Sequence, residues 1–136
     1  QYAQPDKTVV AFIGDGGFQM TIQELGMINQ WKMPVKIVIL DNNFLGMVRQ
    51  WQQLFYDKRY SSVELQNPDF LKIAEGFGIT GKKIEEVSSL KEAVAEMLAY
   101  PGPYLLHVMV EKEDNVFPMV QSGAGVGEIL LEPNNK

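Results

Sequence analysis

Near its start the chain reads Thr8-Val9-Val10-Ala11-Phe12-Ile13-Gly14-Asp15-Gly16-Gly17. The apolar, β-branched run to Ile13 predicts a buried strand, and the glycines after it predict a tight turn. Such a turn brings the backbone close to a ligand, so that N–H groups at the start of a following helix face an anion. We therefore expect a strand, a turn and a helix, with a ligand at their junction.

Similar patterns recur along the chain. Further strands are predicted over residues 35–40, 79–84 and 104–110. Helices are predicted over 18–33, after Gly46, from the cap pair Asn67-Pro68 to Gly78, and from the capping box Ser89-Leu90-Lys91-Glu92. Apolar strands that alternate with helices predict an α/β fold, a parallel sheet with helices on both faces. Residues 111–136 are expected to form an irregular tail of the same single domain, 1–136.

Composition argues against several classes of function. The net charge of −5 argues against nucleic acid and anionic membranes as partners. The absence of cysteine excludes disulfides and Cys-based zinc sites, and no apolar window approaches the roughly 18 residues of a membrane span. The chain starts with Gln1 and shows no signal-peptide pattern, while its first strand begins near Thr8. We therefore expect a piece of a longer protein.

Polar residues follow two successive predicted strands. Asp15 comes directly after the first strand, and Asn42 comes at the end of the second. In parallel sheets ligands bind at the carboxyl ends of the strands, so these residues are expected at one site. Mg²⁺ takes oxygen ligands and often sits between protein groups and phosphates. The carboxylate of Asp15, the side-chain carbonyl of Asn42 and the backbone carbonyl of Phe44 are its candidate ligands.

The turn alone leaves two other interpretations open. One is a plain tight turn with an Asp cap. The other is a dinucleotide site, in which Gly14 and Gly16 match the G-x-G-x-x-G fingerprint and Asp41 would bind a ribose. Gln19 occupies the place of the third glycine, which weakens that match. A P-loop is excluded because the sequence has no Gly-Lys-Ser/Thr.

The spacing of the two strand ends favours a different class of enzyme. Gly14-Asp15-Gly16 and Asn42-Asn43, with 25 residues (17–41) between them, resemble the signature of thiamin-diphosphate enzymes. Three further segments resemble the catalytic large subunit of acetolactate synthase, also called acetohydroxyacid synthase: Gln23-Glu24-Leu25, Leu45 to Tyr56, and Val116 to Gly123. The resemblance runs from about Thr8 to Gly127, and it covers most of the C-terminal domain of that family's subunit. It implies that a strand and a helix upstream of Thr8 are missing.

The resemblance implies a role for each matching residue. Asp15, Asn42 and the carbonyl of Phe44 match the Mg²⁺ ligands. The residues that match cofactor-binding positions are Gly14, Asp15, Gly16, Gly17, Asn42, Leu45, Gly46 and Met47. The residues that match the substrate pocket are Trp51, Ser122 and Gly123. Asp41 departs from relatives that often have Asn there; were Asn43 the ligand instead, the register would slip by one.

Three residues also have plain structural interpretations. Trp51 shares a helical face with Met47, so both are alternatively core residues. His107, the only histidine, lies in an apolar strand and is expected to be structural. Arg49 is expected to be a surface or interface charge.

The resemblance implies a transferase that uses thiamin diphosphate and Mg²⁺. It would decarboxylate pyruvate and join the product to a second 2-keto acid, in branched-chain amino-acid biosynthesis. It also implies FAD on another domain, a homodimer or tetramer, a regulatory small subunit and a bacterial-type cytoplasmic location. No catalytic residue is expected in this segment, since the family's activating glutamate lies on another domain, so the chain alone is expected to be inactive. The alternatives are a pyruvate oxidase or glyoxylate carboligase type of enzyme, or a non-catalytic dinucleotide-binding module.

Overall fold

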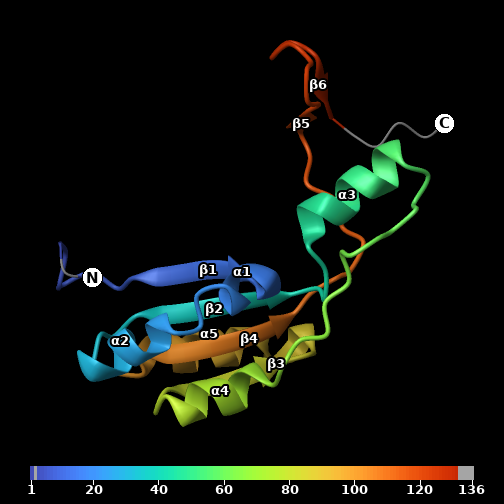
Figure 1. Ribbon diagram of the computed structural model, residues 1–136. Coiled ribbons are helices and arrows are strands. Elements are labelled where there is room, and N and C mark those ends of the chain that lie inside the picture. Colours follow the sequence, from blue (N-terminus) through green and yellow to red (C-terminus); the bar gives the residue numbers. More distant parts are fainter. Residues whose placement is uncertain (2, 132–136) are drawn as a thin grey trace.

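The computed structural model describes residue 1 and residues 3–131. Its central element is a four-stranded parallel sheet in the order β1-β2-β4-β3 (Figure 1). The strands are β1 (Val10–Gly14), β2 (Lys36–Asp41), β3 (Thr80–Ile84) and β4 (Tyr104–Met109). The predicted parallel sheet is confirmed, because short apolar strands joined through helices return in the same direction.

Helices cover both faces of this sheet. They are α1 (Asp15–Gln19), α2 (Glu24–Gln30), α3 (Gly46–Phe55), α4 (Phe70–Gly76) and α5 (Leu90–Ala99), with a 3₁₀ turn, η1 (Val87–Ser89), before α5. In Figure 1, α1, α2 and α4 lie on one face, and α5 lies on the other. The α3 helix is different, since it stands beyond the carboxyl ends of the strands.

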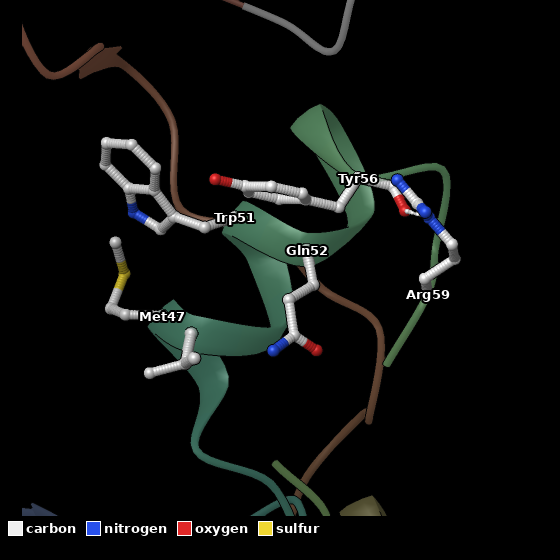
Figure 2. A pocket seen from close by; sticks show the side chains of 6 residues that line it. Met47, Trp51, Gln52, Tyr56 and Arg59 are labelled. Atoms are coloured by element: carbon white, nitrogen blue, oxygen red, sulfur yellow. Dashed lines mark hydrogen bonds between the residues drawn. The ribbon is translucent and has the colours of Figure 1, made fainter. Parts of the chain in front are cut away.

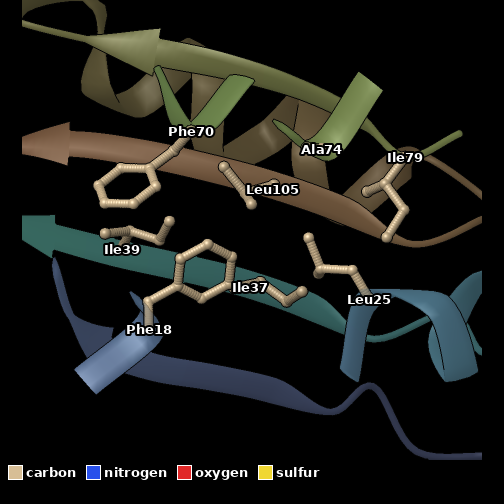
Figure 3. Packing of buried hydrophobic residues seen from close by; sticks show 8 residues of the cluster. All are labelled: Phe18, Leu25, Ile37, Ile39, Phe70, Ala74, Ile79 and Leu105. Carbon is tan, nitrogen blue, oxygen red and sulfur yellow. The ribbon is translucent and has the colours of Figure 1, made fainter. Parts of the chain in front are cut away.

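Each face of the sheet has its own apolar cluster. Figure 3 shows the first, which joins the sheet to α1, α2 and α4; its buried members are Phe18, Leu25, Ile37, Ile39, Phe70, Ala74, Ile79 and Leu105. The second joins the sheet to α5 through Val38, Ile84, Ala93, Met97, Tyr104 and Leu106. Alternate residues of the central strands β2 and β4 serve the two clusters, as expected for strands buried on both faces.

The first strand is less buried than predicted. Phe12 is 71% exposed, although its neighbour in register on β2, Val38, is buried. The reason is that β1 is an edge strand, and α5 packs against β3 and β4 rather than over β1. The apolar pattern predicted the strand, but it carried no information about which part of the sheet a helix covers.

One predicted helix start is wrong, and at another the start at Leu90 is confirmed but the predicted capping box does not form. The helix expected from Asn67-Pro68 begins at Phe70, and its cap is Asp69, whose carboxylate accepts hydrogen bonds from the N–H groups of Leu71 and Lys72, each at 3.1 Å. At the expected capping box, Ser89 already has helical angles because η1 precedes it, and its hydroxyl donates back to the Glu86 carbonyl.

Other helix limits were also refined. The single helix expected over 18–33 is two helices, α1 and α2, joined by turns at 20–23. Gly78 follows α4 with a φ of +70°, which confirms its predicted role as the stop, because glycine tolerates left-handed angles.

The tail after β4 is not wholly irregular. Two short antiparallel strands, β5 (Met119–Val120) and β6 (Ile129–Leu130), pair beside α3 and away from the main sheet (Figure 1). The last part of the predicted tail, residues 132–136, lies outside the described residues. Among the described residues, no helix has the length and apolar character needed to cross a bilayer.

Candidate functional site

The two polar strand ends lie side by side. The parallel register pairs Gly14 with Leu40, so Asp15 at the start of α1 lies next to Asp41 at the end of β2. Both carboxylates are buried, each only 2% exposed. The sequence predicted this meeting of the strand ends, and the geometry confirms it.

A third residue, Asn67, joins these two carboxylates. Its side-chain Nδ2 donates to Oδ2 of Asp15 at 2.7 Å and to Oδ1 of Asp41 at 2.8 Å. On the far side of Asp41, Oδ2 lies 2.7 Å from Nε2 of His107 on β4. The site is therefore built on a chain of four polar side chains from β2, β4, α1 and the segment before α4, of which Asn67 is half-buried and the other three are buried.

Asn67 reaches the strand ends through a short backbone ladder. Leu45 N donates to the Val63 carbonyl and Leu65 N to the Asn43 carbonyl, both at 2.8 Å. These bonds pair the segment after β2 with the segment before α4. The last of them is made by Leu65, and Asn67 follows two residues later. Sequence reasoning treated Asn67 as a helix cap; Asp69, just past Pro68, was the signal that another cap was available.

Burial changes the acidity of the central carboxylate. Desolvation raises the pKa of Asp15 above its ordinary 3.8, and the like charge of Asp41 raises it further. The hydrogen bond from Asn67 acts in the opposite direction and lowers this pKa. A cation at Asp15 would favour the ionised form in the same way.

The turn after β2 separates the two asparagines. Asn42 Oδ1 accepts from Phe44 N at 3.1 Å, and Asp41 Oδ1 accepts from Asn43 N at 3.0 Å. Asn43 has a left-handed φ of 58°. Asn42 lines a cavity together with Asp15 and Phe44, whereas Asn43 lines a different one together with His107. The three proposed Mg²⁺ ligands thus share one cavity, and Asn43 faces another.

Two adjoining cavities lie over the glycine turn. Both are lined by Gly14, Asp15, Phe44, Gly46 and Met47. The larger, of about 450 Å³, also has Asn42, Gln50 and Val116 in its wall. The smaller, of about 270 Å³, also has Gly16, Gly17, Leu45 and Val48. All eight predicted cofactor-binding residues therefore line one or both cavities.

The donor set of these cavities suits a hard cation and a phosphate group. Among the described residues, no cluster of three His, Cys, Asp or Glu side chains forms a metal cage. At the strand ends the oxygens come from the Asp15 carboxylate, the Asn42 amide and backbone carbonyls, which suits Mg²⁺ shared with a phosphate, and two more acidic residues, Glu111 and Asp114, lie further along the wall of the larger cavity. At the same cavity α3 begins without a side-chain cap, so its first N–H groups are free to meet an anion.

An open cleft of about 740 Å³ continues from this region along α3 (Figure 2). It is lined by Met47, Val48, Trp51, Gln52, Tyr56 and Arg59. Met47 and Val48 also line the smaller cavity, so the cleft adjoins it. Trp51 is half-buried and packs its ring against Phe55, with centroids 5.3 Å apart.

The other two predicted pocket residues lie elsewhere. Ser122 and Gly123 are exposed in a turn after β5, and Gly123 has a φ of +83°. The cleft wall is built by α3 and the turn that follows it, without either residue. The structure therefore does not bring Ser122 and Gly123 to Trp51.

Arg49 was expected to be a surface or interface charge, and the surface part of that expectation is wrong. Its side chain is fully buried, and its guanidinium donates to the carbonyl of Asp114 and the side chains of Asn115 and Gln53. These contacts hold the segment after β4 against α3. A helical pattern alone could not reveal this partner, because residue 114 lies 65 positions away along the chain.

Comparison with known proteins agrees with this geometry. A family model described as "Thiamine pyrophosphate enzyme, C-terminal TPP binding domain" matches residues 1–108. The chain belongs to this family of thiamine pyrophosphate enzymes. Thiamine pyrophosphate is the same compound as thiamin diphosphate, so the predicted cofactor class and fold are both confirmed.

Relatives of this thiamine pyrophosphate domain include acetolactate synthases. The chain is 50% identical, over 96% of its length, to the acetolactate synthase isozyme 2 large subunit of Escherichia coli K12, of which it spans 24%. It is 43% identical, again over 96%, to the mitochondrial acetolactate synthase catalytic subunit of Saccharomyces cerevisiae, of which it spans 19%. The chain therefore spans about a fifth to a quarter of these relatives, and the resemblance to the acetolactate synthase large subunit is confirmed.

A solved structure of another thiamine-dependent enzyme has the same fold. The thiamine diphosphate-dependent 4-hydroxybenzoylformate decarboxylase of Rhodococcus jostii RHA1 superposes with a TM-score of 0.77 at 30% identity. The match covers 84% of this thiamine pyrophosphate domain and 22% of that chain. The α/β architecture described above is thus shared with a thiamine diphosphate-dependent decarboxylase.

Proposed function

We propose that this chain is the C-terminal, cofactor-anchoring domain of an acetolactate synthase catalytic subunit. The observation that supports this most is the shared cavity of Asp15, Asn42 and Phe44 at the strand ends, which adjoins the cleft of Met47 and Trp51. The 50% identity to an acetolactate synthase large subunit supports the same assignment.

In this proposal the chain holds and orients the cofactor. Asp15, Asn42 and the Phe44 carbonyl bind Mg²⁺, and the metal neutralises the diphosphate. Backbone N–H groups of Gly16, Gly17 and the first turn of α3 complete the diphosphate site. When bound, the thiazolium of the cofactor supplies the group that attacks the keto carbon of pyruvate.

The cleft along α3 is proposed as the substrate side of the site. Met47 lies at the junction of the cleft and both cavities, so it is placed to pack beside the cofactor's pyrimidine ring. Trp51 further along α3 limits the space for a second 2-keto acid. In this chain Ser122 and Gly123 lie in an exposed turn. A role for them at the substrate channel is therefore proposed only for the assembled enzyme.

The remaining parts of the activity are proposed to lie outside this chain. They are the activating glutamate, the domain for FAD, the dimer or tetramer contacts, and a regulatory small subunit, in a cytoplasmic enzyme of branched-chain amino-acid synthesis. The 136 residues alone are therefore proposed to be inactive. Conversion of pyruvate to acetolactate by the purified chain would contradict this.

Calorimetry tests the anchoring role directly. Thiamin diphosphate is titrated into the full-length subunit with Mg²⁺, and again with EDTA in place of Mg²⁺; binding is expected only with the metal. Binding of NAD without metal dependence would instead favour a dinucleotide module. A keto-acid screen on the same protein, with acetolactate as the expected product, separates this function from pyruvate oxidase or glyoxylate carboligase activity.

The two asparagines after β2 provide a matched pair of variants. Asn42→Ala is expected to weaken Mg²⁺-dependent binding, because Asn42 lines the cavity of Asp15. Asn43→Gly is the control, since Asn43 faces another cavity and glycine tolerates its φ of 58°. A larger loss in Asn43→Gly than in Asn42→Ala would overturn the ligand assignment.

A further inference from the structure

Asn67 makes a complete set of side-chain hydrogen bonds at the strand ends. Its two N–H groups go to Asp15 and Asp41, at 2.7 Å and 2.8 Å, and its Oδ1 accepts from Nε2 of Gln19 at 2.7 Å. Ionised carboxylates only accept hydrogen bonds, so the amide has one orientation that satisfies all three neighbours. Asn67 is thus fixed, and it fixes Asp15 in turn.

Asp41 is itself held in place by further hydrogen bonds. Its Oδ1 also accepts from the N–H of Asn43, and its Oδ2 is paired with His107 at 2.7 Å. Both oxygens of Asp41 are therefore engaged, and Asp41 lines a different cavity, together with Asn43 and His107. Asp15, by contrast, lines both cofactor cavities while its Oδ2 is held by Asn67.

Two buried carboxylates in contact repel one another unless a donor lies between them. Asp15 and Asp41 are each 2% exposed, so water screens this repulsion poorly. The amide of Asn67 directs one N–H to each carboxylate and offsets the repulsion. Helix capping does not account for Asn67, because Asp69 caps α4.

We propose that Asn67 is a positioning residue for the cation: it holds the Asp15 carboxylate in place, braced by Asp41 and His107. This inference rests on the proposed function, in which Asp15 binds Mg²⁺. Groups that orient a metal ligand typically change metal affinity by about 10- to 100-fold when they are removed. Asn67 contributes this effect without touching the metal or the cofactor.

The test measures Mg²⁺ affinity by calorimetry, with the full-length subunit in saturating thiamin diphosphate. Asn67→Leu keeps the approximate size and removes the donors, and it is expected to bind Mg²⁺ roughly 10- to 100-fold more weakly. Gln66→Leu is the matched control, an exposed neighbour that is expected to keep the wild-type affinity. Melting of each variant without ligands shows that it is folded.

A rescue variant separates positioning from a general structural role. In the Asn67→Leu background, Asp41→Asn replaces the like charge beside Asp15 with an amide that can donate to the Asp15 carboxylate in place of Asn67, so the double variant is expected to recover part of the Mg²⁺ affinity. Absence of recovery would overturn the proposal. Should Asn67→Leu fail to fold, Gln19→Leu takes its place. Gln19 is exposed, and its loss removes the hydrogen bond that fixes the orientation of the Asn67 amide, so Mg²⁺ binding is expected to weaken. An unchanged Mg²⁺ affinity would overturn the proposal.

The two proposals fail in different ways. If the wild-type subunit binds no Mg²⁺ and thiamin diphosphate, the proposed function fails, and this inference fails with it. If the wild type binds and Asn67→Leu binds equally well, the role of Asn67 alone is overturned.

Discussion

Gln50 and Val116 exchange two hydrogen bonds. Val116 N donates to Oε1 of Gln50 at 2.7 Å, and Nε2 of Gln50 donates to the Val116 carbonyl at 3.0 Å. The side-chain amide of α3 thus acts like a neighbouring strand for the segment after β4. Both residues line the larger cavity over the glycine turn, so these hydrogen bonds shape its wall.

Loss of the hydrogen bonds between Gln50 and Val116 is expected to destabilise the packing of the segment after β4 against α3. Gln50→Ala leaves the N–H and carbonyl of Val116 without partners, and should lower the unfolding free energy by about 1–3 kcal/mol. Gln52 provides the control, because it makes the same pair of bonds with Ser61, at 3.0 and 2.9 Å, on the exposed side. Gln52→Ala should change stability by about 0.5 kcal/mol or less.

Urea denaturation measures both variants, and hydrogen exchange over residues 114–120 reports the tail itself. Faster exchange is expected there in Gln50→Ala only. Equal losses of stability in the two variants would show that burial of the Gln50 pair has no importance.

A second pair of variants tests the uneven burial of the sheet. Phe70 is fully buried and packs edge-on against Phe18, at 5.4 Å, so Phe70→Ala should destabilise by about 3–5 kcal/mol. Phe12 is 71% exposed on the edge strand, so Phe12→Ala should destabilise by less than about 1 kcal/mol. Chemical denaturation of this chain measures both; a large loss from Phe12→Ala would mean that another segment or copy covers β1.

The buried Asp15 carboxylate is expected to lower the stability of the ligand-free protein, although it is the proposed Mg²⁺ ligand. Burial raises its pKa above 3.8, so the folded chain binds this proton more tightly than the unfolded chain. The unfolding free energy of the ligand-free protein therefore falls as the pH rises from 3.8 through the folded-state pKa. Asp15→Asn removes this loss and should raise the Tm at neutral pH.

The same substitution should abolish the cation site. Loss of a direct ligand should weaken Mg²⁺ binding by more than the roughly 100-fold expected for an orienting group. Below pH 3.8 the Tm advantage should vanish, because the carboxyl is then protonated in both states. Calorimetric melts across this range check the sign, and a lower Tm for Asp15→Asn at neutral pH would contradict it.

Asp69 should show the opposite pH dependence. Hydrogen bonds from the backbone N–H of Lys72 and of Leu71 lower its pKa below 3.8. Its contribution is therefore fully present above 3.8 and is lost as the pH falls through the folded-state pKa. Asp69→Ala should lower the Tm at neutral pH, and Asp69→Ser, which retains a cap, should lower it less. Equal Tm values for the wild type and both variants would contradict the capping role of Asp69.

Local patterns were enough to predict the sheet and the meeting of its two polar strand ends. The runs at Val10–Ile13, at 35–40 and at 104–110 alternate with helical patterns, and buried strands that are joined through helices favour parallel pairing. Because parallel strands end at the same edge, Asp15 and Asn42 had to come together. Spacing along the chain carried this information, and the family match agrees with it.

Partners distant in the sequence were decided only by tertiary structure. Asn67 was predicted as a cap, yet the pairing of the segments around Leu45 and Val63 places it between Asp15 and Asp41. Arg49 was predicted as a surface or interface charge, yet the segment after β4 returns to α3 and buries it at Asp114. A side chain's polarity shows that it needs partners, but which partners it meets depends on how the whole chain packs.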